Sequence, residues 1–104
     1  MLIPEHKFLV EKVFQVDETK DKKHKFQRII LKKPGYTDEL GEKIGKDDFF
    51  ECRAWNKKLN EIPVLKSGDK VKALLALQGT CHLDITNGQE FYYTQFTIRK
   101  IQLL

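Results

Sequence analysis

The chain has 104 residues, of which 40% are hydrophobic and 33% are charged, and it carries a formal net charge of +4 at pH 7. This length predicts one folded domain over residues 1–104, and no apolar run approaches the length that crosses a bilayer. Pro4 and nearby charges interrupt the amino terminus where a secretory signal requires an unbroken apolar segment, so the sequence predicts a cytoplasmic protein without a membrane anchor.

The amino-terminal part predicts a long strand followed by a basic loop. A broken alternation of apolar residues over residues 7–16 is typical of a strand with a bulge near Glu11 and Lys12. Residues 17–25 have no periodic apolar position and therefore predict a loop. Across residues 20–33, six lysines and one arginine stand against a single acid, which gives a local charge of +6. Such a run is typical of a solvated loop and also suits an anionic partner.

Residues 25–33 predict a second strand, which Pro34 and Gly35 end. One face of this strand carries Gln27, Ile29 and Leu31, and the other carries Phe26, Arg28, Ile30 and Lys32. The next segment, residues 36–48, contains two glycines and only two aliphatic residues, so it predicts a long, mobile loop.

Residues 49–55 predict a third strand whose two faces differ in chemistry. The inward face, which suits the interior of a narrow barrel, carries Phe50, Cys52 and Ala54. The outward face carries Phe49, Glu51, Arg53 and Trp55. Two outward aromatic rings with a guanidinium between them favour a flat, anionic partner such as a nucleic-acid strand. The alternative is that another part of the chain or a second subunit covers these rings.

The carboxyl-terminal half predicts a short helical turn limited by Pro63, then two more strands. The fourth strand, residues 71–79, is apolar on both faces, which predicts a subunit contact as well as a core contact. The Asn87-Gly88 pair predicts a hairpin with a type I′ turn. In the last strand, residues 91–104, strict alternation places Ile98 and Lys100 on one face.

Five strands with a short helix between the third and fourth predict an all-β fold, the OB-fold, which is a five-stranded Greek-key barrel. The cysteines, Cys52 and Cys81, and the scattered histidines lack the spacing of a metal site or a disulfide framework. We therefore expect no metal and no cofactor. The sequence also has no Gly-rich phosphate loop, nucleophile elbow or paired metal ligands, so it does not predict an enzyme.

Three motifs resemble, in order, the single-stranded DNA-binding proteins of bacteria and their phages. The third strand and helix of the family are similar to FFECRAWNKKLNEI. The family's turn into strand four is similar to LKSGDKVKALLALQG, and its closing strand is similar to EFYYTQFTIRKIQLL. This resemblance implies largely sequence-independent binding of single-stranded DNA in replication, recombination or repair. It also implies that Phe49 and Trp55 stack on bases, with Arg53 between them.

Two features depart from the family pattern. The family's hairpin aromatic has no counterpart at Leu83 or Asp84, unless Phe91, Tyr92 or Tyr93 replaces it. The sequence ends at Leu104 without the acidic tail that recruits replication partners in the family, so the resemblance does not imply a partner-loading role.

Aromatic platforms bind bases through their π-faces, and basic side chains neutralise phosphates. On these grounds the predicted contact residues on the two strands are Phe26, Arg28, Lys32, Phe49, Arg53 and Trp55, and those in the loop are Lys22, Lys23 and Lys25. RNA is the related alternative to DNA. A second hypothesis is an OB-fold interaction or oligomerisation subunit of a replication or conjugation assembly. The apolar fourth strand favours a homo-oligomer, a dimer or a tetramer.

Overall fold

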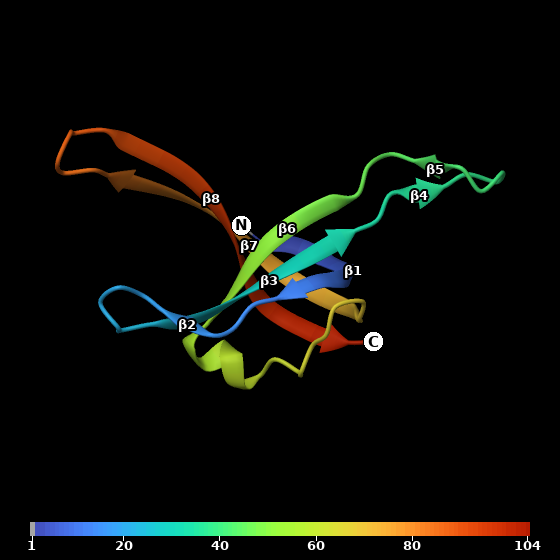
Figure 1. The fold of residues 1–104 in the computed structure, drawn as a ribbon, viewed down its shortest axis with the longest axis horizontal. Coiled ribbons are helices and arrows are strands. Elements are labelled where there is room, and N and C mark those ends of the chain that lie inside the picture. Colours follow the sequence, from blue (N-terminus) through green and yellow to red (C-terminus); the bar gives the residue numbers. More distant parts are fainter. Residues whose placement is uncertain (1) are drawn as a thin grey trace.

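The computed structural model describes residues 2–104, which form a mostly β structure (Figure 1). The long strands are β1 (Leu2–Val13), β3 (Lys25–Lys33), β6 (Asp48–Trp55), β7 (Lys70–Leu83) and β8 (Glu90–Leu103). The shorter elements are β2 (Asp17–Glu18), β4 (Tyr36–Thr37), β5 (Lys43–Ile44) and the 3₁₀ helix η1 (Asn56–Asn60). Within residues 2–104, no helix is long and apolar enough to cross a membrane.

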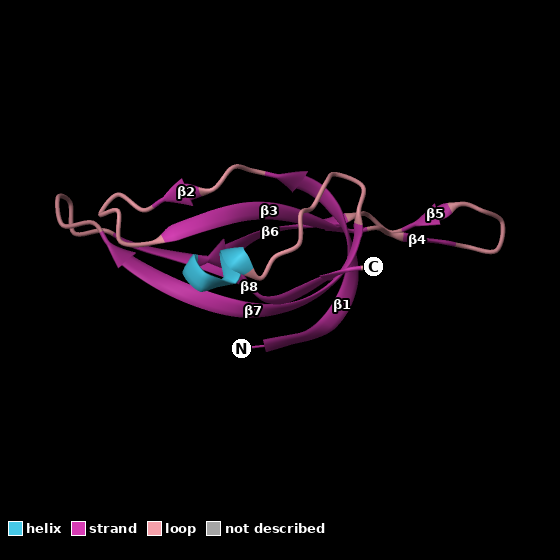
Figure 2. Ribbon diagram, turned by 90° about the horizontal axis from the view of Figure 1, so that it is seen from below, coloured by secondary structure: helices cyan, strands magenta, loops and turns pink. Residues whose placement is uncertain are grey.

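The five long strands close into a ring. β1 pairs with β7 and β3, β7 pairs with β8, and β6 pairs with both β8 and β3. The pairing of β6 with β8 is parallel and the others are antiparallel. Figure 2 shows β1 curving round the barrel, so that it borders β7 along its first part and β3 at its end. This strand order is that of the OB-fold barrel, which confirms the predicted fold.

Alternate side chains of the strands fill the barrel. Ile29, Leu31, Cys52 and Ala54 are fully buried, which confirms the predicted inward faces of β3 and β6. Phe50 is half-buried and packs edge-on against two further rings, with centroids 5.9 Å from Phe8 and 5.3 Å from Phe96. The other members of the core cluster are Phe8, Val10, Leu65, Val71, Ala73, Leu75, Ile98 and Ile101.

Register shifts at bulges decide which side chains point inward. The register between β1 and β3 shifts between Val10 and Lys12, where the sequence predicts a bulge. A second shift places Leu74 opposite Lys100 but Leu75 opposite Ile98, so that Arg99 is an extra residue on β8. Strict alternation wrongly placed Lys100 on the face of Ile98. The bulge instead turns Ile101 into the core, where it is 9% exposed.

The outer face of β7 is less open than its apolar pattern suggests. Leu74 is half-buried and Ala76 is only 6% exposed within the single chain. These two outward positions of β7 are therefore already largely covered within the single chain, where the sequence predicted a contact with a second subunit.

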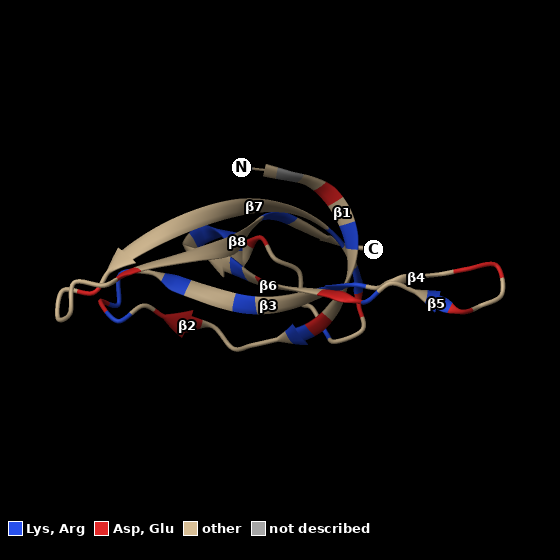
Figure 3. Cartoon of the chain, turned by 90° about the horizontal axis from the view of Figure 1, so that it is seen from above, with Lys and Arg blue, Asp and Glu red and all other residues tan. Residues whose placement is uncertain are grey.

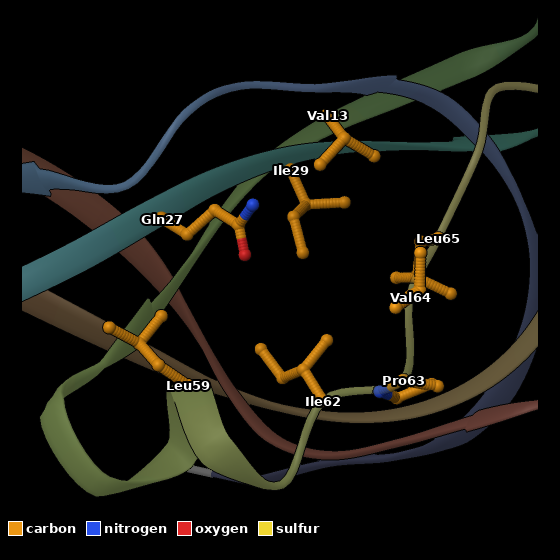
Figure 4. Close-up of a pocket in the computed structure, with 8 residues that line it drawn as sticks. All are labelled: Val13, Gln27, Ile29, Leu59, Ile62, Pro63, Val64 and Leu65. Atoms are coloured by element: carbon orange, nitrogen blue, oxygen red, sulfur yellow. The ribbon is translucent and has the colours of Figure 1, made fainter.

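The predicted helical turn is the 3₁₀ helix η1, which follows β6 directly. Leu59 and Ile62 pack against the core, as the sequence predicts. A cavity of about 240 Å³ remains between this segment and β3 (Figure 4). Its lining consists of Val13, Gln27, Ile29, Leu59, Ile62, Pro63, Val64 and Leu65. A helix of five residues thus covers this end of the barrel incompletely.

Two hairpins project from the barrel toward opposite ends of its long axis (Figure 1). β7 and β8 continue as a two-stranded ribbon as far as Leu83 and Glu90. The segment predicted as a loop, residues 36–48, contains the hairpin β4–β5, in which the Asp38 carboxylate accepts hydrogen bonds from the backbone N–H groups of Leu40 and Glu42. The radius of gyration is 16.1 Å, above the value of about 13 Å for a compact chain of this length, because of these arms.

The turn between β7 and β8 is not the predicted type I′. That turn requires positive φ at both central residues, whereas Gly88 has φ of +71° and Asn87 does not have a positive φ. The Gly88 N–H instead donates to the Asp84 carbonyl oxygen at 2.8 Å. The Asp84 carboxylate also accepts from the Thr86 N–H at 2.9 Å, which stabilises a longer loop.

Candidate nucleic-acid interface

The outward faces of β3 and β6 form one surface. Their antiparallel register places Phe26 opposite Trp55, Arg28 opposite Arg53, Ile30 opposite Glu51, and Lys32 opposite Phe49. Directly opposed residues of an antiparallel pair share a face. The structure therefore brings together the six strand residues predicted to contact nucleic acid.

An aromatic pair with a guanidinium over it lies at one end of this surface. The ring centroids of Phe26 and Trp55 are 5.0 Å apart at an interplanar angle of 40°. The Arg53 Cζ atom lies 4.8 Å from the Phe26 centroid and 5.9 Å from the Trp55 centroid. All three side chains are half-buried. The neighbours thus hold the rings in place while part of each remains accessible to a ligand.

Arg28 occupies the middle of the surface, between a carboxylate and an aromatic ring. Its Nη1 atom donates to Glu51 Oε1 at 2.9 Å, and its Cζ atom lies 4.1 Å from the Phe14 centroid. The Lys12 Nζ atom lies 4.7 Å from the same ring. Glu51, an acid among basic residues, is therefore neutralised locally by Arg28.

Phe14 and Lys12 are members of this surface that the sequence did not identify. They follow the bulge at Glu11, which changes the phase of the strand, so simple alternation could not place them. The Phe14 N–H donates to the Arg28 carbonyl oxygen at 3.1 Å, which fixes the position of Phe14 beside β3.

The far end of the surface carries Lys32 and Phe49. Lys32 Nζ lies 3.5 Å from Asp47 Oδ2 and 5.9 Å from the Phe49 centroid. The Asp47 carboxylate also accepts from Lys43 Nζ at 2.7 Å and from the Gly35 N–H at 3.0 Å. These bonds, chiefly that from Lys43, lower the pKa of Asp47 to about 2. Phe49 is 56% exposed, so its ring is open to a ligand.

The predicted basic loop stands beside the aromatic end of the surface. Lys22, Lys23 and Lys25 are exposed. The backbone N–H of Lys25 donates to Asn56 Oδ1 at 3.0 Å, and Asn56 Nδ2 lies 3.1 Å from His24 Nδ1. Because Asn56 directly follows Trp55, these bonds tie the loop to the end of β6. Figure 3 shows lysine and arginine (blue) along β3 and in this loop, whereas residues 77–95, in the projecting part of the β7–β8 hairpin, include no lysine or arginine.

A second wall of the surface comes from β8. The parallel pairing of β6 with β8 joins Cys52 to Phe96 and Arg53 to Thr97. Beyond these pairs the β7–β8 ribbon projects away from the barrel (Figure 1). A cavity of about 240 Å³ lies between β6 and β8. It is lined by Glu51, Arg53, Tyr93, Thr94, Gln95 and Phe96.

The lining of this cavity shows which of three aromatic residues in the hairpin lies on the binding surface, a choice that the sequence did not decide. Tyr93 lines it beside Arg53 and is 46% exposed. Tyr92 is 73% exposed, and its hydroxyl donates to Glu90 Oε2 at 2.5 Å, which raises the pKa of the phenol. Neither Tyr92 nor Phe91 is part of the lining. Tyr93 is thus the hairpin aromatic that continues the surface.

Among residues 2–104 there is no group of three or more histidine, cysteine, aspartate or glutamate side chains placed to hold a metal ion. Cys81 is exposed and Cys52 is buried, and neither forms a disulfide. Burial, with a smaller contribution from Glu51, raises the pKa of the Cys52 thiol to about 12, so this group is not an activated nucleophile.

No family model matches the chain, and no curated protein sequence matches it. The solved structures that are similar over nearly all of it include three single-stranded DNA-binding proteins. A small single-stranded DNA-binding protein from Streptomyces coelicolor has 18% identity and a TM-score of 0.67, covering 100% of this chain and 94% of that one. A Plasmodium falciparum SSB in complex with ssDNA has 14% identity and a TM-score of 0.65, covering 99% and 93%.

The third structure is a deletion mutant of the single-stranded DNA-binding protein from Thermus aquaticus. It has 15% identity and a TM-score of 0.63, and the match covers 99% of this chain and 51% of that chain. At these identities the likeness shows the fold. The chain therefore has the OB-fold that these single-stranded DNA-binding proteins share.

Proposed function

We propose that this protein binds single-stranded DNA without chemical turnover, through base stacking and phosphate neutralisation on the outward face of β3 and β6. The observation that carries the proposal is the cross-strand register, which sets Phe26 against Trp55 and Lys32 against Phe49 with Arg28 and Arg53 between them. Aromatic rings that alternate with cations on one exposed face suit bases and phosphates together. The shared fold supports the same assignment.

Binding of this kind is largely independent of sequence, because every base offers a π-face to an aromatic ring. The phosphates of the strand pass the basic loop, where Lys22, Lys23 and Lys25 add positive charge beside Trp55. A role in DNA replication, recombination or repair follows, since these processes expose single strands.

The direct test uses Trp55, which is the single tryptophan of the chain. Titration with oligo(dT) at low salt should quench its fluorescence, because a base stacks on the indole. The logarithm of the association constant should fall with the logarithm of salt concentration by about 0.7 per phosphate contacted. Unchanged fluorescence and unchanged anisotropy of a labelled oligonucleotide at micromolar concentrations would refute the proposal.

The choice between DNA and RNA is tested separately. Oligo(dU) and oligo(rU) differ only in the 2′-hydroxyl, so equal affinities would extend the proposed function to RNA. A preference for oligo(dU) would restrict it to DNA.

A second candidate function is protein association, including homo-oligomer formation. It is favoured by apolar side chains at the tips of the projecting hairpins, where Leu40 is 87% exposed, Leu83 54% and Ile85 90%. Exposed apolar groups of this kind are typical of interaction sites. Light scattering with and without oligonucleotide tests it. A stable dimer or tetramer without an oligonucleotide-induced change in mass or fluorescence would favour association over DNA binding.

A further inference from the structure

The cavity between β6 and the β7–β8 ribbon has the size and the polar lining of a site for one nucleobase. Its volume of about 240 Å³ lies just below the range of about 300–1,000 Å³ that suits drug-sized ligands. Tyr93 supplies aromatic surface, while Glu51, Arg53 and Gln95 supply hydrogen-bonding groups. A base of the bound strand fits this description better than a phosphate, because a carboxylate repels phosphate.

The lining groups differ in what they can discriminate. The ring of Tyr93 stacks on any base, and the Gln95 carboxamide and the Thr94 hydroxyl each offer a donor and an acceptor. Arg53 only donates hydrogen bonds, and an ionised Glu51 only accepts them. Glu51 is thus the one member of the lining that favours a base edge with a donor and penalises an edge with only an acceptor.

The structure also holds the Glu51 carboxylate in place. Arg28 Nη1 donates to Oε1 at 2.9 Å, and the Glu51 side chain remains 49% exposed. In the described part of the chain, no hydrogen bond to Oε2 accompanies this pair. One carboxylate oxygen is therefore anchored while the other is free to accept a hydrogen bond from a ligand.

We infer that this cavity is a base-selective subsite that prefers bases with an exocyclic amino group, such as cytosine, over thymine. Cytosine presents its N4 amino group as a donor to Glu51 and offers acceptors to Arg53, whereas thymine presents the O4 acceptor in the place of the amino group. The one donor on the thymine edge, N3–H, lies between two carbonyl oxygens that repel a carboxylate. Single-stranded bases expose these edges for such contacts. The inference rests on the proposed function and adds a local base preference to an otherwise sequence-tolerant surface.

The test compares oligo(dC) and oligo(dT) of equal length, by anisotropy competition at mildly alkaline pH, where cytosine is unprotonated. Both are pyrimidine strands with the same number of phosphates, so their affinity ratio reports mainly the base edge. The wild-type protein should prefer oligo(dC) by about fivefold or more, as one discriminating base contact implies. In Glu51→Gln the ratio should approach one, because a carboxamide can face either an amino group or a carbonyl group.

The matched control is Glu18→Gln on β2, which also removes one negative charge but does not line the cavity. This control should leave the ratio of the oligo(dC) affinity to the oligo(dT) affinity at the wild-type value, even if both affinities rise. A Glu51 that only anchors Arg28 would change both affinities by the same factor in Glu51→Gln and leave the ratio unchanged, which would overturn the inference. Equal binding of both strands by the wild type would also overturn it while leaving the proposed function intact, whereas no binding of either strand would overturn both.

Discussion

Arg28 and Glu51 lie diagonally across β3 and β6, two residues out of direct register, and are joined by an ion pair of 2.9 Å in the middle of the candidate binding surface. Both side chains remain more than two-fifths exposed, at 41% and 49%. Exposed pairs of this kind contribute only about 0–1 kcal/mol to stability. The pair therefore orients Arg28 without holding it so strongly that a phosphate could not compete for the guanidinium.

Trp55→Ala is expected to weaken oligo(dT) binding by about 1–3 kcal/mol, because one stacked base loses its platform. The affinity is measured by anisotropy of a labelled oligonucleotide, since the variant has no tryptophan. Tyr36→Ala is the matched control, because Tyr36 is an exposed aromatic on β4, outside the surface. Equal losses for the two variants would argue against stacking on Trp55.

Phe14→Leu is expected to weaken oligo(dT) binding with little change in thermal stability. Leucine retains apolar volume beside β3 but removes the ring on which Arg28 and Lys12 lie, at 4.1 Å and 4.7 Å. A cation–π contact at an exposed site contributes about 0.5–1 kcal/mol, so the affinity should fall by about two- to fivefold. Isothermal titration measures the affinity, and an unchanged value would show that Phe14 does not help to position Arg28.

Lys23→Ala is expected to lower the affinity for all sequences alike and to reduce the salt slope by about 0.7, which is the effect of one lost phosphate contact on a single strand. The affinity is measured at several salt concentrations between about 50 and about 200 mM. Lys66→Ala, near the turn before β7, is the control and should leave the slope unchanged. A slope that stays constant in Lys23→Ala would place the loop outside the binding path.

Asp47 is expected to make stability depend on acid pH. Its pKa is lowered from 3.8 to about 2 in the folded protein by Lys43 and the Gly35 N–H. A carboxyl group whose folded pKa is depressed stabilises the fold above its unfolded pKa and loses that contribution as pH falls toward the folded value. The difference in Tm between the wild type and Asp47→Asn should therefore shrink between about pH 4 and about pH 2. A difference in Tm that is constant with pH would contradict the assignment.

The two cysteines are expected to differ sharply in reactivity. Cys81 is exposed on the β7–β8 ribbon, whereas Cys52 is buried with a thiol pKa raised to about 12. A thiol-specific colorimetric reagent should modify Cys81 rapidly in the native protein and Cys52 only after unfolding. Cys81→Ser should abolish the rapid phase. Rapid modification in that variant would show that the barrel opens around Cys52.

The sequence by itself determined the two faces of β3 and of β6. Alternation along residues 49–55 separates Phe50, Cys52 and Ala54 from Arg53 and its outward neighbours, because successive side chains of any extended strand point to opposite sides. The structure agrees with this division, since Cys52 and Ala54 are fully buried. The order of strands and helix also predicted the barrel, because that order restricts the ways in which five strands can close.

Only the tertiary structure decided which outward residues meet. The pairing of Phe26 with Trp55, the partner of Glu51 and the place of Tyr93 all depend on strand register and on how far the β7–β8 ribbon projects. Register depends on loops and on contacts between residues distant in the sequence, which no local pattern encodes. The bulge at Arg99 shows the same limit, because one extra residue reverses the face of every residue beyond it.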